Sequence, residues 1–310
     1  MSKFLVTGGA GFIGSHIVER LVSQNNFVRV LDNFSSGKES NLKGVIDKID
    51  LLKGDIRSGG TCIKATKGID FVLHQAALRS VPKSMQSPGE YNEVNIGGIL
   101  NMLEASARNG VKRFIFASSS SVYGDIGDFP EREDFLPQPI SVYALTKLAG
   151  EHYCRIFSHH YGLACIALRY FNVFGPRQSV DDEYAVVIPK FITCILNGER
   201  PPIYGTGRQS RDFTYIDNVV GANILAAAKT NLKAGVFNVA SGKDYSVLEL
   251  VKLLNRIMGK NIKPLFLSKR PGDVFRTLAD LSRSKKILGF RPKIDFVKGL
   301  NLTVGYFKNA

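Results

Sequence analysis

Tyr143 and Lys147 stand four residues apart, in a stretch whose pattern predicts a helix over residues 142–161. Side chains at positions i and i+4 share one face of a helix, so the phenol and the ammonium would be neighbours. A tyrosine with a pKa of about 10 is a poor base at neutral pH, and a nearby positive charge favours its ionised form. The pair therefore predicts a general base for a sugar or alcohol hydroxyl, with Lys147 lowering the pKa of Tyr143.

Four consecutive serines, at positions 118–121, follow a predicted strand over residues 113–117. Ligands bind beyond the carboxyl ends of strands in parallel sheets, so a hydroxyl here could hydrogen-bond a reacting oxygen. A flexible loop is the alternative interpretation. The composition of the run does not decide which serine would act.

A glycine-rich turn, T-G-G-A-G-F-I-G at residues 7–14, lies between a predicted strand and a predicted helix. Gly8, Gly11 and Gly14 would allow a tight turn, close approach of the backbone to a pyrophosphate, and close packing of helix and strand. The start of the helix would then hold the phosphate charge. This pattern predicts a dinucleotide site.

An acidic residue, Asp32, ends the second predicted strand eighteen residues after Gly14. A carboxylate there would accept hydrogen bonds from ribose hydroxyls and repel a 2′-phosphate, which predicts NAD rather than NADP, although Lys38 lies close by. Asp55 follows a third predicted strand. It would lie near the adenine or cap a helix.

The elements that carry these residues alternate between short apolar runs and longer helical stretches. This predicts an α/β protein, with a doubly wound Rossmann-type parallel sheet and a smaller mixed α/β C-terminal lobe. The larger domain is expected over residues 1–171 and 214–241, and the lobe over 172–213 and 242–310. Strands are expected at 3–7, 28–32, 49–53, 71–74, 113–117, 165–170 and 236–240, and helices at 12–23, 90–109, 142–161 and 219–229.

The composition excludes several classes of protein. With 310 residues, of which 44% are hydrophobic, the chain is long enough for a sizeable core. No apolar run is long enough for a membrane span or a signal peptide. The four cysteines are scattered without metal-ligand spacing, which predicts reduced thiols in a cytoplasmic protein and no metal site. The net charge of +14 is spread along the chain, so it indicates a solvated surface or an anionic ligand such as a nucleotide rather than DNA or RNA.

Taken together, these motifs resemble the extended short-chain dehydrogenase/reductase superfamily. More narrowly, the chain is similar to the UDP-hexose 4-epimerases, especially the branch that acts on UDP-N-acetylglucosamine. The resemblance covers nearly the whole chain, and its landmarks include the segments 7–14, 32–37, 74–77, 118–124, 143–147, 168–177, 187–191 and 211–213.

The resemblance implies roles for individual residues. Tyr143 would be the base, Lys147 its electrostatic partner and a ligand of the nicotinamide ribose, and Ser119 the catalytic hydroxyl. NAD would contact Gly8, Gly11, Phe12, Ile13, Gly14, Asp32, Asn33, Ser35, Gly37, Asp55, Ile56, Ala76, Ala77, Asn95 and Tyr170, besides Tyr143 and Lys147. The nucleotide sugar would contact Arg79, Ser120, Ser121, Asn172, Val187, Ile188, Tyr204, Arg211, Arg270, Asp273 and Thr277.

The reaction that the resemblance implies removes hydrogen from C4 of the sugar and returns it to the opposite face of a 4-keto intermediate. Thr277 matches a position where a bulky tyrosine closes the pocket to an N-acetyl group, so threonine implies turnover of UDP-GlcNAc/UDP-GalNAc together with UDP-Glc/UDP-Gal. The family also implies a homodimer formed through the helices at 90–109 and 142–161.

The chain departs from the family pattern at several positions. Val142 replaces a common proline, and Ser58 replaces a common aspartate. Arg79 stands where relatives carry glycine or lysine, so it could meet a uronate carboxylate; UDP-glucuronate 4-epimerisation or decarboxylation is therefore an alternative. A 4,6-dehydratase is disfavoured because the serine run has no carboxylate, and a reductase would exchange its cofactor. The alternative outside enzymes is a catalytically silent NAD- or RNA-binding relative.

Overall fold

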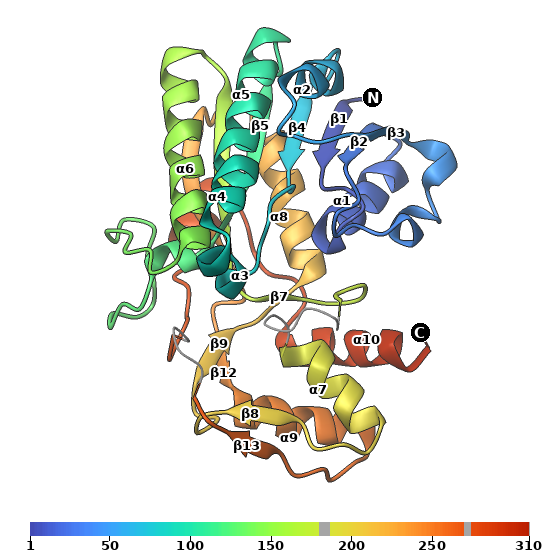
Figure 1. Ribbon diagram of the computed structural model, residues 1–310, viewed down its shortest axis with the longest axis vertical. Coiled ribbons are helices and arrows are strands. Elements are labelled where there is room, and N and C mark those ends of the chain that lie inside the picture. The colour runs from blue at the N-terminus through green and yellow to red at the C-terminus, as the bar shows by residue number, and fades with distance from the viewer. Residues whose placement is uncertain (180–186, 270–273, 310) are drawn as a thin grey trace.

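A parallel sheet of seven strands forms the larger part of the molecule (Figure 1). This computed structural model describes residues 1–179, 187–269 and 274–309. The strands lie in the order β11–β6–β5–β4–β1–β2–β3, and every neighbouring pair is parallel. Their bounds are β1 Lys3–Thr7, β2 Phe27–Asp32, β3 Asp50–Lys53, β4 Phe71–His74, β5 Arg113–Ser119, β6 Ala164–Tyr170 and β11 Ala234–Val239.

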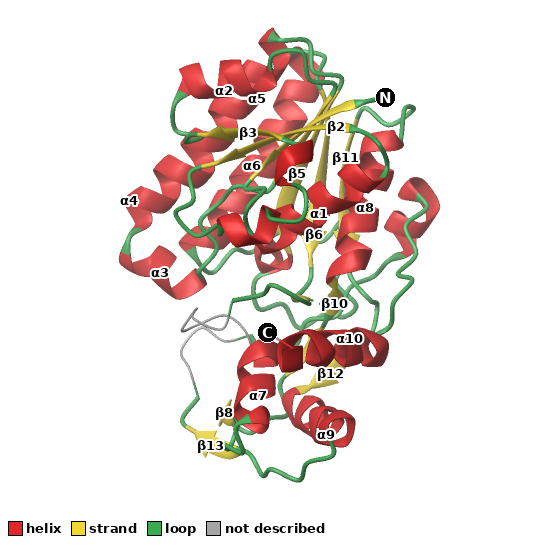
Figure 2. Ribbon diagram, turned by 90° about the vertical axis from the view of Figure 1, so that its right-hand side faces the viewer, coloured by secondary structure: helices red, strands yellow, loops and turns green. Residues whose placement is uncertain are grey.

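Helices cover both faces of this sheet (Figure 2). Successive residues of a strand point to opposite faces, and in β1 Leu5 packs in one hydrophobic cluster while Val6 packs in the other. The doubly wound parallel sheet predicted from the sequence is thus confirmed. The helices are α1 Phe12–Ser23 and α8 Ile216–Ala228 on one face, and α2 Gly59–Thr66, α5 Gly98–Arg108 and α6 Val142–His160 on the other.

The helix before α5 is not regular. α4 (Pro88–Tyr91) continues into a π-helical turn at Asn92–Gly97 and then into α5, so the single helix predicted over 90–109 contains a wider turn. π-turns of this kind occur mostly as single bulges and often at functional sites. Asn95, in this turn, is buried.

A second group of elements lies beyond the carboxyl ends of the strands, at the bottom of Figure 1. Three two-stranded sheets pair β7 with β10, β9 with β12, and β8 with β13. Their elements are β7 Val173–Phe174, β8 Pro202–Tyr204, β9 Ser210–Asp212, β10 Thr214–Tyr215, β12 Asp244–Ser246 and β13 Leu265–Leu267, with α7 Val187–Leu196, α9 Val247–Met258 and α10 Phe296–Asn309. One hydrophobic cluster continues from the sheet into these elements. The division into two lobes stays a prediction.

Short helices complete the chain: α3 Val81–Gln86 and the turns η1 Glu39–Leu42, η2 Ile46–Lys48, η4 Ser120–Tyr123 and η5 Ser284–Leu288. Among the described residues no helix is both long and apolar enough to cross a membrane. The same residues contain no group of three His, Cys, Asp or Glu side chains arranged to hold a metal ion. The four cysteines are buried and free.

Candidate active site

A cavity of about 710 Å³ lies at the carboxyl ends of the central strands. In this sheet the chain leaves β1 toward β2 on one side and reaches β4 on the other, and ligands bind at such a switch point. The cavity wall includes the glycine turn, the serine run, Tyr143 and Lys147. Residues from 8 to 307 in the sequence are therefore brought to one site.

The first turns of α6 carry Tyr143 and Lys147. Ser141 caps this helix by accepting a hydrogen bond of 3.1 Å from the backbone N–H of Ala144. Lys147 is buried; its Nζ donates to the carbonyl oxygen of Ala117 at 2.9 Å and lies 5.8 Å from the centre of the Tyr143 ring. The ammonium has three donors, so two remain for a bound group.

The protonation of this pair differs from the expectation. Burial raises the pKa of Tyr143, while a hydrogen bond with Ser119 and the charge of Arg79 act to lower it. Burial also lowers the pKa of Lys147 to about 7. The prediction that Lys147 would lower the pKa of the phenol is thus not what the protein alone produces, because burial is the largest cause of the pKa shift of both groups.

The serines of the run face different ways. Ser119 hydrogen-bonds the phenol of Tyr143, and its hydroxyl lies 3.1 Å from that of Ser121. Ser118 is buried, and its hydroxyl donates to Oε1 of Glu151 at 2.5 Å. Ser119, Ser120 and Ser121 line the cavity. Geometry therefore distinguishes Ser119 from Ser118, which composition could not do.

The glycine turn leaves no room for side chains. Gly8 has φ of +66°, and a Cβ there would lie 2.8 Å from the backbone nitrogen of Ala76. A Cβ on Gly14 would lie 2.1 Å from the carbonyl oxygen of Gly8. Gly11 precedes α1 without a side-chain cap, and the first turn of α1 holds no acidic residue. The amides at the start of this helix can therefore hold an anion.

Asp32 lies beside this turn and is buried. Its carboxylate accepts hydrogen bonds from the backbone N–H groups of Ala10, at 2.9 Å, and Phe34, at 2.8 Å. Each carboxylate oxygen can accept a further hydrogen bond. The other predicted cofactor residues on the cavity wall are Phe12, Ile13, Asn33, Ser35, Gly37, Asp55, Ile56, Ala76, Ala77 and Tyr170.

Asp55 is not the cap of the following helix. It accepts hydrogen bonds from Arg57 and from the side chain of Asn33, and the bond with Arg57 lowers its pKa to about 2. Ser58 caps α2 instead, by accepting from the N–H of Thr61 at 3.3 Å. The departure at Ser58 therefore preserves a helix cap.

A buried chain of hydrogen bonds holds the backbone at Ala76. The N–H of Ala76 donates to the hydroxyl of Thr7 at 3.2 Å, and that hydroxyl lies 2.9 Å from Nδ1 of His74. Burial, and then the charge of Lys147, lower the pKa of His74 to about 3. The imidazole is therefore neutral, and its Nδ1 can accept a hydrogen bond from the hydroxyl of Thr7.

Asn95 is not on the cavity wall as the described residues define it. Its carboxamide both accepts from the N–H of Leu78, at 2.8 Å, and donates to the carbonyl of Leu78, at 2.9 Å. It also donates to Thr146, whose hydroxyl bonds the carbonyl of Tyr143 at 2.8 Å. The contact of Asn95 with the cofactor stays a prediction, and in this structure its carboxamide links the loop before Arg79 to the helix of Tyr143.

The predicted substrate residues fall into three groups. Arg79, Ser120, Ser121 and Asn172 line the cavity. Of the other described residues predicted here, none contributes to its wall: Val187, Ile188, Tyr204, Arg211 and Thr277. Arg270 and Asp273 lie outside the described residues. Ile188 is in the hydrophobic core, and Arg211 donates to the carbonyl oxygen of Ser210.

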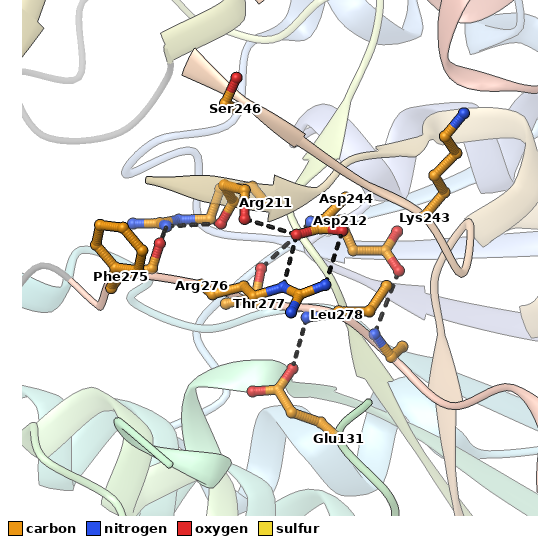
Figure 3. A network of polar contacts seen from close by, with 12 residues as sticks. Glu131, Arg211, Asp212, Lys243, Asp244, Ser246, Phe275, Arg276, Thr277 and Leu278 are labelled. Atoms are coloured by element: carbon orange, nitrogen blue, oxygen red, sulfur yellow. Dashed lines mark hydrogen bonds and ion pairs between the residues drawn. The ribbon is translucent and has the colours of Figure 1, made fainter. Parts of the chain in front are cut away.

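Thr277 is held in a polar network beside the cavity (Figure 3). The N–H of Asp212 donates to the carbonyl oxygen of Thr277 at 3.0 Å and lies 3.3 Å from its hydroxyl. Asn172, on the cavity wall at a φ of +28°, donates to the same hydroxyl at 3.0 Å. Thr277 thus does not line the cavity itself but contacts Asn172, which does.

Several lining residues were missed by the sequence reasoning. They are Ser36, Lys38, Ser40, Asn41, Gln75, Leu78, Arg177, Gln178, Ser179, Tyr306 and Phe307, among others. Arg177 was part of a family landmark but had no role assigned. The two aromatic residues come from α10, and no local pattern connects them to the glycine turn.

Comparison with known proteins identifies the chain. The model of the NAD dependent epimerase/dehydratase family matches residues 4–240. The chain belongs to this family. Among solved structures, the UDP-N-acetylglucosamine 4-epimerase of Methanobrevibacter ruminantium, in complex with UDP-N-acetylmuramic acid, is 43% identical, with a TM-score of 0.95 and 99% of each chain covered.

Two further members of the epimerase family show the same full-length likeness. The UDP-glucose 4-epimerase of Thermotoga maritima, with UDP-glucose, is 40% identical, with a TM-score of 0.93 and coverage of 99% of this chain and 98% of that one. The UDP-glucuronic acid 4-epimerase of Bacillus cereus, with UDP-glucuronic acid and NAD, is 32% identical, with a TM-score of 0.91 and 99% of both chains covered.

The residues of this epimerase-family chain fit NAD, its cofactor. The narrow glycine turn and the uncapped start of α1 suit a pyrophosphate, and the buried carboxylate of Asp32 suits ribose hydroxyls. Gln178, on the cavity wall, has a buried Oε1 atom without a hydrogen-bond partner in the described part of the chain. An unused acceptor in the wall is consistent with a bound group that donates to it.

Proposed function

We propose that this protein is an NAD-dependent 4-epimerase of UDP-sugars, which interconverts UDP-GlcNAc and UDP-GalNAc and also UDP-glucose and UDP-galactose. The observation that carries the proposal is that Tyr143, Lys147 and Ser119 share one cavity with the glycine turn and Asp32. The full-length similarity to the Methanobrevibacter and Thermotoga enzymes supports the substrate class.

In this proposal Tyr143 removes the proton of the C4 hydroxyl and later returns it. Ser119, hydrogen-bonded to the phenol, orients the reacting oxygen and stabilises the ionised ring oxygen. Lys147 stays anchored on the carbonyl of Ala117 and offers its other protons to the ribose next to the nicotinamide. NAD, when bound, supplies the acceptor and donor of hydride at C4.

The sugar would lie against Ser120, Ser121 and Asn172. The hydroxyl of Thr277, which Asn172 bonds, marks the expected limit of the pocket for an N-acetyl group. Threonine is small, so the proposal includes acetylated hexosamines. Val187, Ile188, Tyr204, Arg211, Arg270 and Asp273 remain proposed contacts of the nucleotide.

Arg79 supports a second candidate, epimerisation of UDP-glucuronate. Its side chain lines the cavity, and its charge acts on the pKa of Tyr143, so the guanidinium lies near the reacting groups. A guanidinium pairs well with a carboxylate, in two parallel hydrogen bonds. The similarity to the Bacillus enzyme adds to this candidate.

We further propose a homodimer formed through α5 and α6. Leu145 and Ile156, both on α6, are exposed apolar residues that a partner helix would cover. The four free, buried cysteines agree with a reducing compartment, for which we propose the cytoplasm.

The test is to incubate the purified protein, without added cofactor, with UDP-GlcNAc, UDP-glucose and UDP-glucuronate in turn, and to resolve the products by NMR. We expect the C4 epimer of the first two. Tyr143→Phe should lower the rate by roughly 10²–10⁴-fold while NAD stays bound. A protein that forms no epimer from UDP-GlcNAc or UDP-glucose, or a Tyr143→Phe variant at the wild-type rate, would refute the proposal, and an epimer from UDP-glucuronate alone would favour the second candidate.

A further inference from the structure

Arg177 follows β7 and contacts α1 at His16 and Glu19. It lines the same cavity as the glycine turn. Its φ is +66°, in the left-handed region that residues other than glycine rarely adopt. Such a conformation persists only where the surroundings hold the residue in place.

The contacts of its guanidinium explain what holds it. Nη1 and Nη2 donate to the two carboxylate oxygens of Glu19, on α1, at 2.8 and 2.7 Å. Nη1 also donates to the carbonyl of Asn41, at 3.0 Å, and Nε lies 3.3 Å from Nε2 of His16. The Arg177 side chain is only 12% exposed, and that of Glu19 is 40% exposed. Paired hydrogen bonds of this kind fix orientation as well as distance.

These contacts continue to the glycine turn. The side chain of Asn41 donates to the carbonyl of Ala10 at 2.8 Å, and the N–H of Lys38 donates to the same oxygen at 3.1 Å. The N–H of Ala10 in turn donates to Asp32. A continuous set of hydrogen bonds therefore joins Arg177 to the parts of the cavity that suit pyrophosphate and ribose.

Gln178, the residue after Arg177, has one half of its carboxamide bonded to the protein. Its Nε2 donates to the carbonyl of Val173 at 2.8 Å. Its Oε1 is buried without a partner within the described ranges, although the residue lines the cavity. An acceptor left unused in the wall points to a donor on the bound molecule.

We propose that Arg177 fastens the segment 176–178 over the glycine-turn end of the cavity and thereby slows the release of NAD. This segment follows β7, whereas Glu19 lies on α1 and Asn41 on η1, the elements that follow β1 and β2. Opening the cavity at this end requires that the paired hydrogen bonds between Arg177 and Glu19 break. The proposal concerns retention of the cofactor and does not depend on which sugar the enzyme converts.

The experiment measures cofactor release. Each protein is loaded with isotope-labelled NAD, desalted and mixed with excess unlabelled NAD, and the label that stays bound is followed by mass spectrometry. We expect Arg177→Met to release NAD at least about tenfold faster than wild type, since loss of one partner of a bonded charge pair acts mainly on dissociation. Arg177→Lys, which keeps the charge but not the paired geometry, should lie between the two.

A matched control is Arg132→Met. Arg132 also forms a two-bond ion pair, with Asp134, but it is exposed and is not on the cavity wall defined by the described residues. It should release NAD at the wild-type rate. If Arg177→Met folds and releases NAD as slowly as wild type, the proposal is wrong. If that variant does not fold, Glu19→Gln decides in the same way, because the amide keeps the shape of Glu19 and one acceptor for Arg177 but cannot form the paired hydrogen bonds of a carboxylate. Because sugar turnover is not measured, failure of the epimerase proposal would leave this result unaffected.

Discussion

Arg169 on β6 and Glu151 on α6 form an ion pair inside the protein, with nitrogen–oxygen distances of 2.9 and 2.7 Å. The two side chains are only 3% and 5% exposed. Glu151 also accepts a hydrogen bond from the hydroxyl of Ser118, the residue next to Ser119. One buried charge pair therefore fixes the end of β5 relative to the helix that carries Tyr143 and Lys147.

Replacing Arg169 with Met should destabilise the protein strongly, because Glu151 would stay buried without its partner. We expect a loss of about 3–5 kcal/mol in the free energy of unfolding, measured by urea denaturation. The double variant Arg169→Met/Glu151→Leu should recover much of this loss. The exposed ion pair between Arg132 and Asp134 offers a control, since Arg132→Met should lower the free energy of unfolding by less than about 1 kcal/mol. Equal losses for the two arginines would contradict the argument.

Glu131 predicts how stability depends on pH. Its side chain is buried and accepts one hydrogen bond, from the N–H of Leu278 at 3.2 Å, and burial raises its pKa to about 8. Between its ordinary value of 4.5 and about 8 the folded protein holds a proton that the unfolded chain releases. Stability from this group is therefore full below pH 4.5 and falls as the pH rises to about 8.

Glu131→Gln should remove this dependence, because the amide stays neutral. We expect the melting temperature of this variant to change less between pH 5 and 8 than that of wild type, and to exceed it at pH 8, in thermal denaturation. Glu199→Gln, at an exposed position, is the control and should follow wild type. A variant whose pH profile overlays that of wild type would show that Glu131 does not titrate as its burial indicates.

Arg79 predicts a shift in the pH dependence of the rate. Its charge acts to lower the pKa of Tyr143, so Arg79→Met should raise that pKa. In the proposed reaction the ionised phenol is the base, so the acidic limb of kcat against pH should move to higher pH. Measurement with UDP-GlcNAc and with UDP-glucuronate separates this effect from recognition of a carboxylate, which would add a larger KM for the uronate alone. A limb that moves to lower pH would contradict the assignment.

Thr277→Tyr should lower kcat/KM for UDP-GlcNAc by about tenfold or more relative to UDP-glucose. Thr277 is 7% exposed, and its hydroxyl accepts a hydrogen bond from Asn172. The ring of a tyrosine at this position must therefore displace Asn172 or enter the space beside it. Thr277→Ala, which stays small, should keep the preference of wild type. Steady-state kinetics with both sugars test the prediction, and an unchanged ratio in Thr277→Tyr would rule out a role in limiting the pocket.

The features that the sequence predicts well are those set by residues close together in the chain. β1, β4 and α1 begin and end where the apolar pattern and the glycines predict, at Lys3–Thr7, Phe71–His74 and Phe12–Ser23. Tyr143 and Lys147 could be paired because four residues on one helix share a face. The fold and the central part of the site therefore followed from local patterns.

The remaining features depend on contacts between distant residues. The hydrogen bond between Asn172 and Thr277 joins positions 105 residues apart, and the bond between Asn95 and Thr146 joins positions 51 apart. Nor does the apolar pattern reveal the raised pKa of Tyr143, because the degree of burial is set by the whole fold. The spacing of charges along a helix could not supply this information.

The wider turn at Asn92–Gly97 restricts how this region of the gene can gain or lose codons. A π-turn holds one more residue than a turn of α-helix. Deleting one residue there would convert the wide turn into an ordinary α-helical turn and leave the two halves of the helix nearly in register. Asn95 lies within the wide turn, so the backbone that directs its carboxamide to both Leu78 and Thr146 would be lost, and homologous sequences should keep the length of this stretch even where its residues differ.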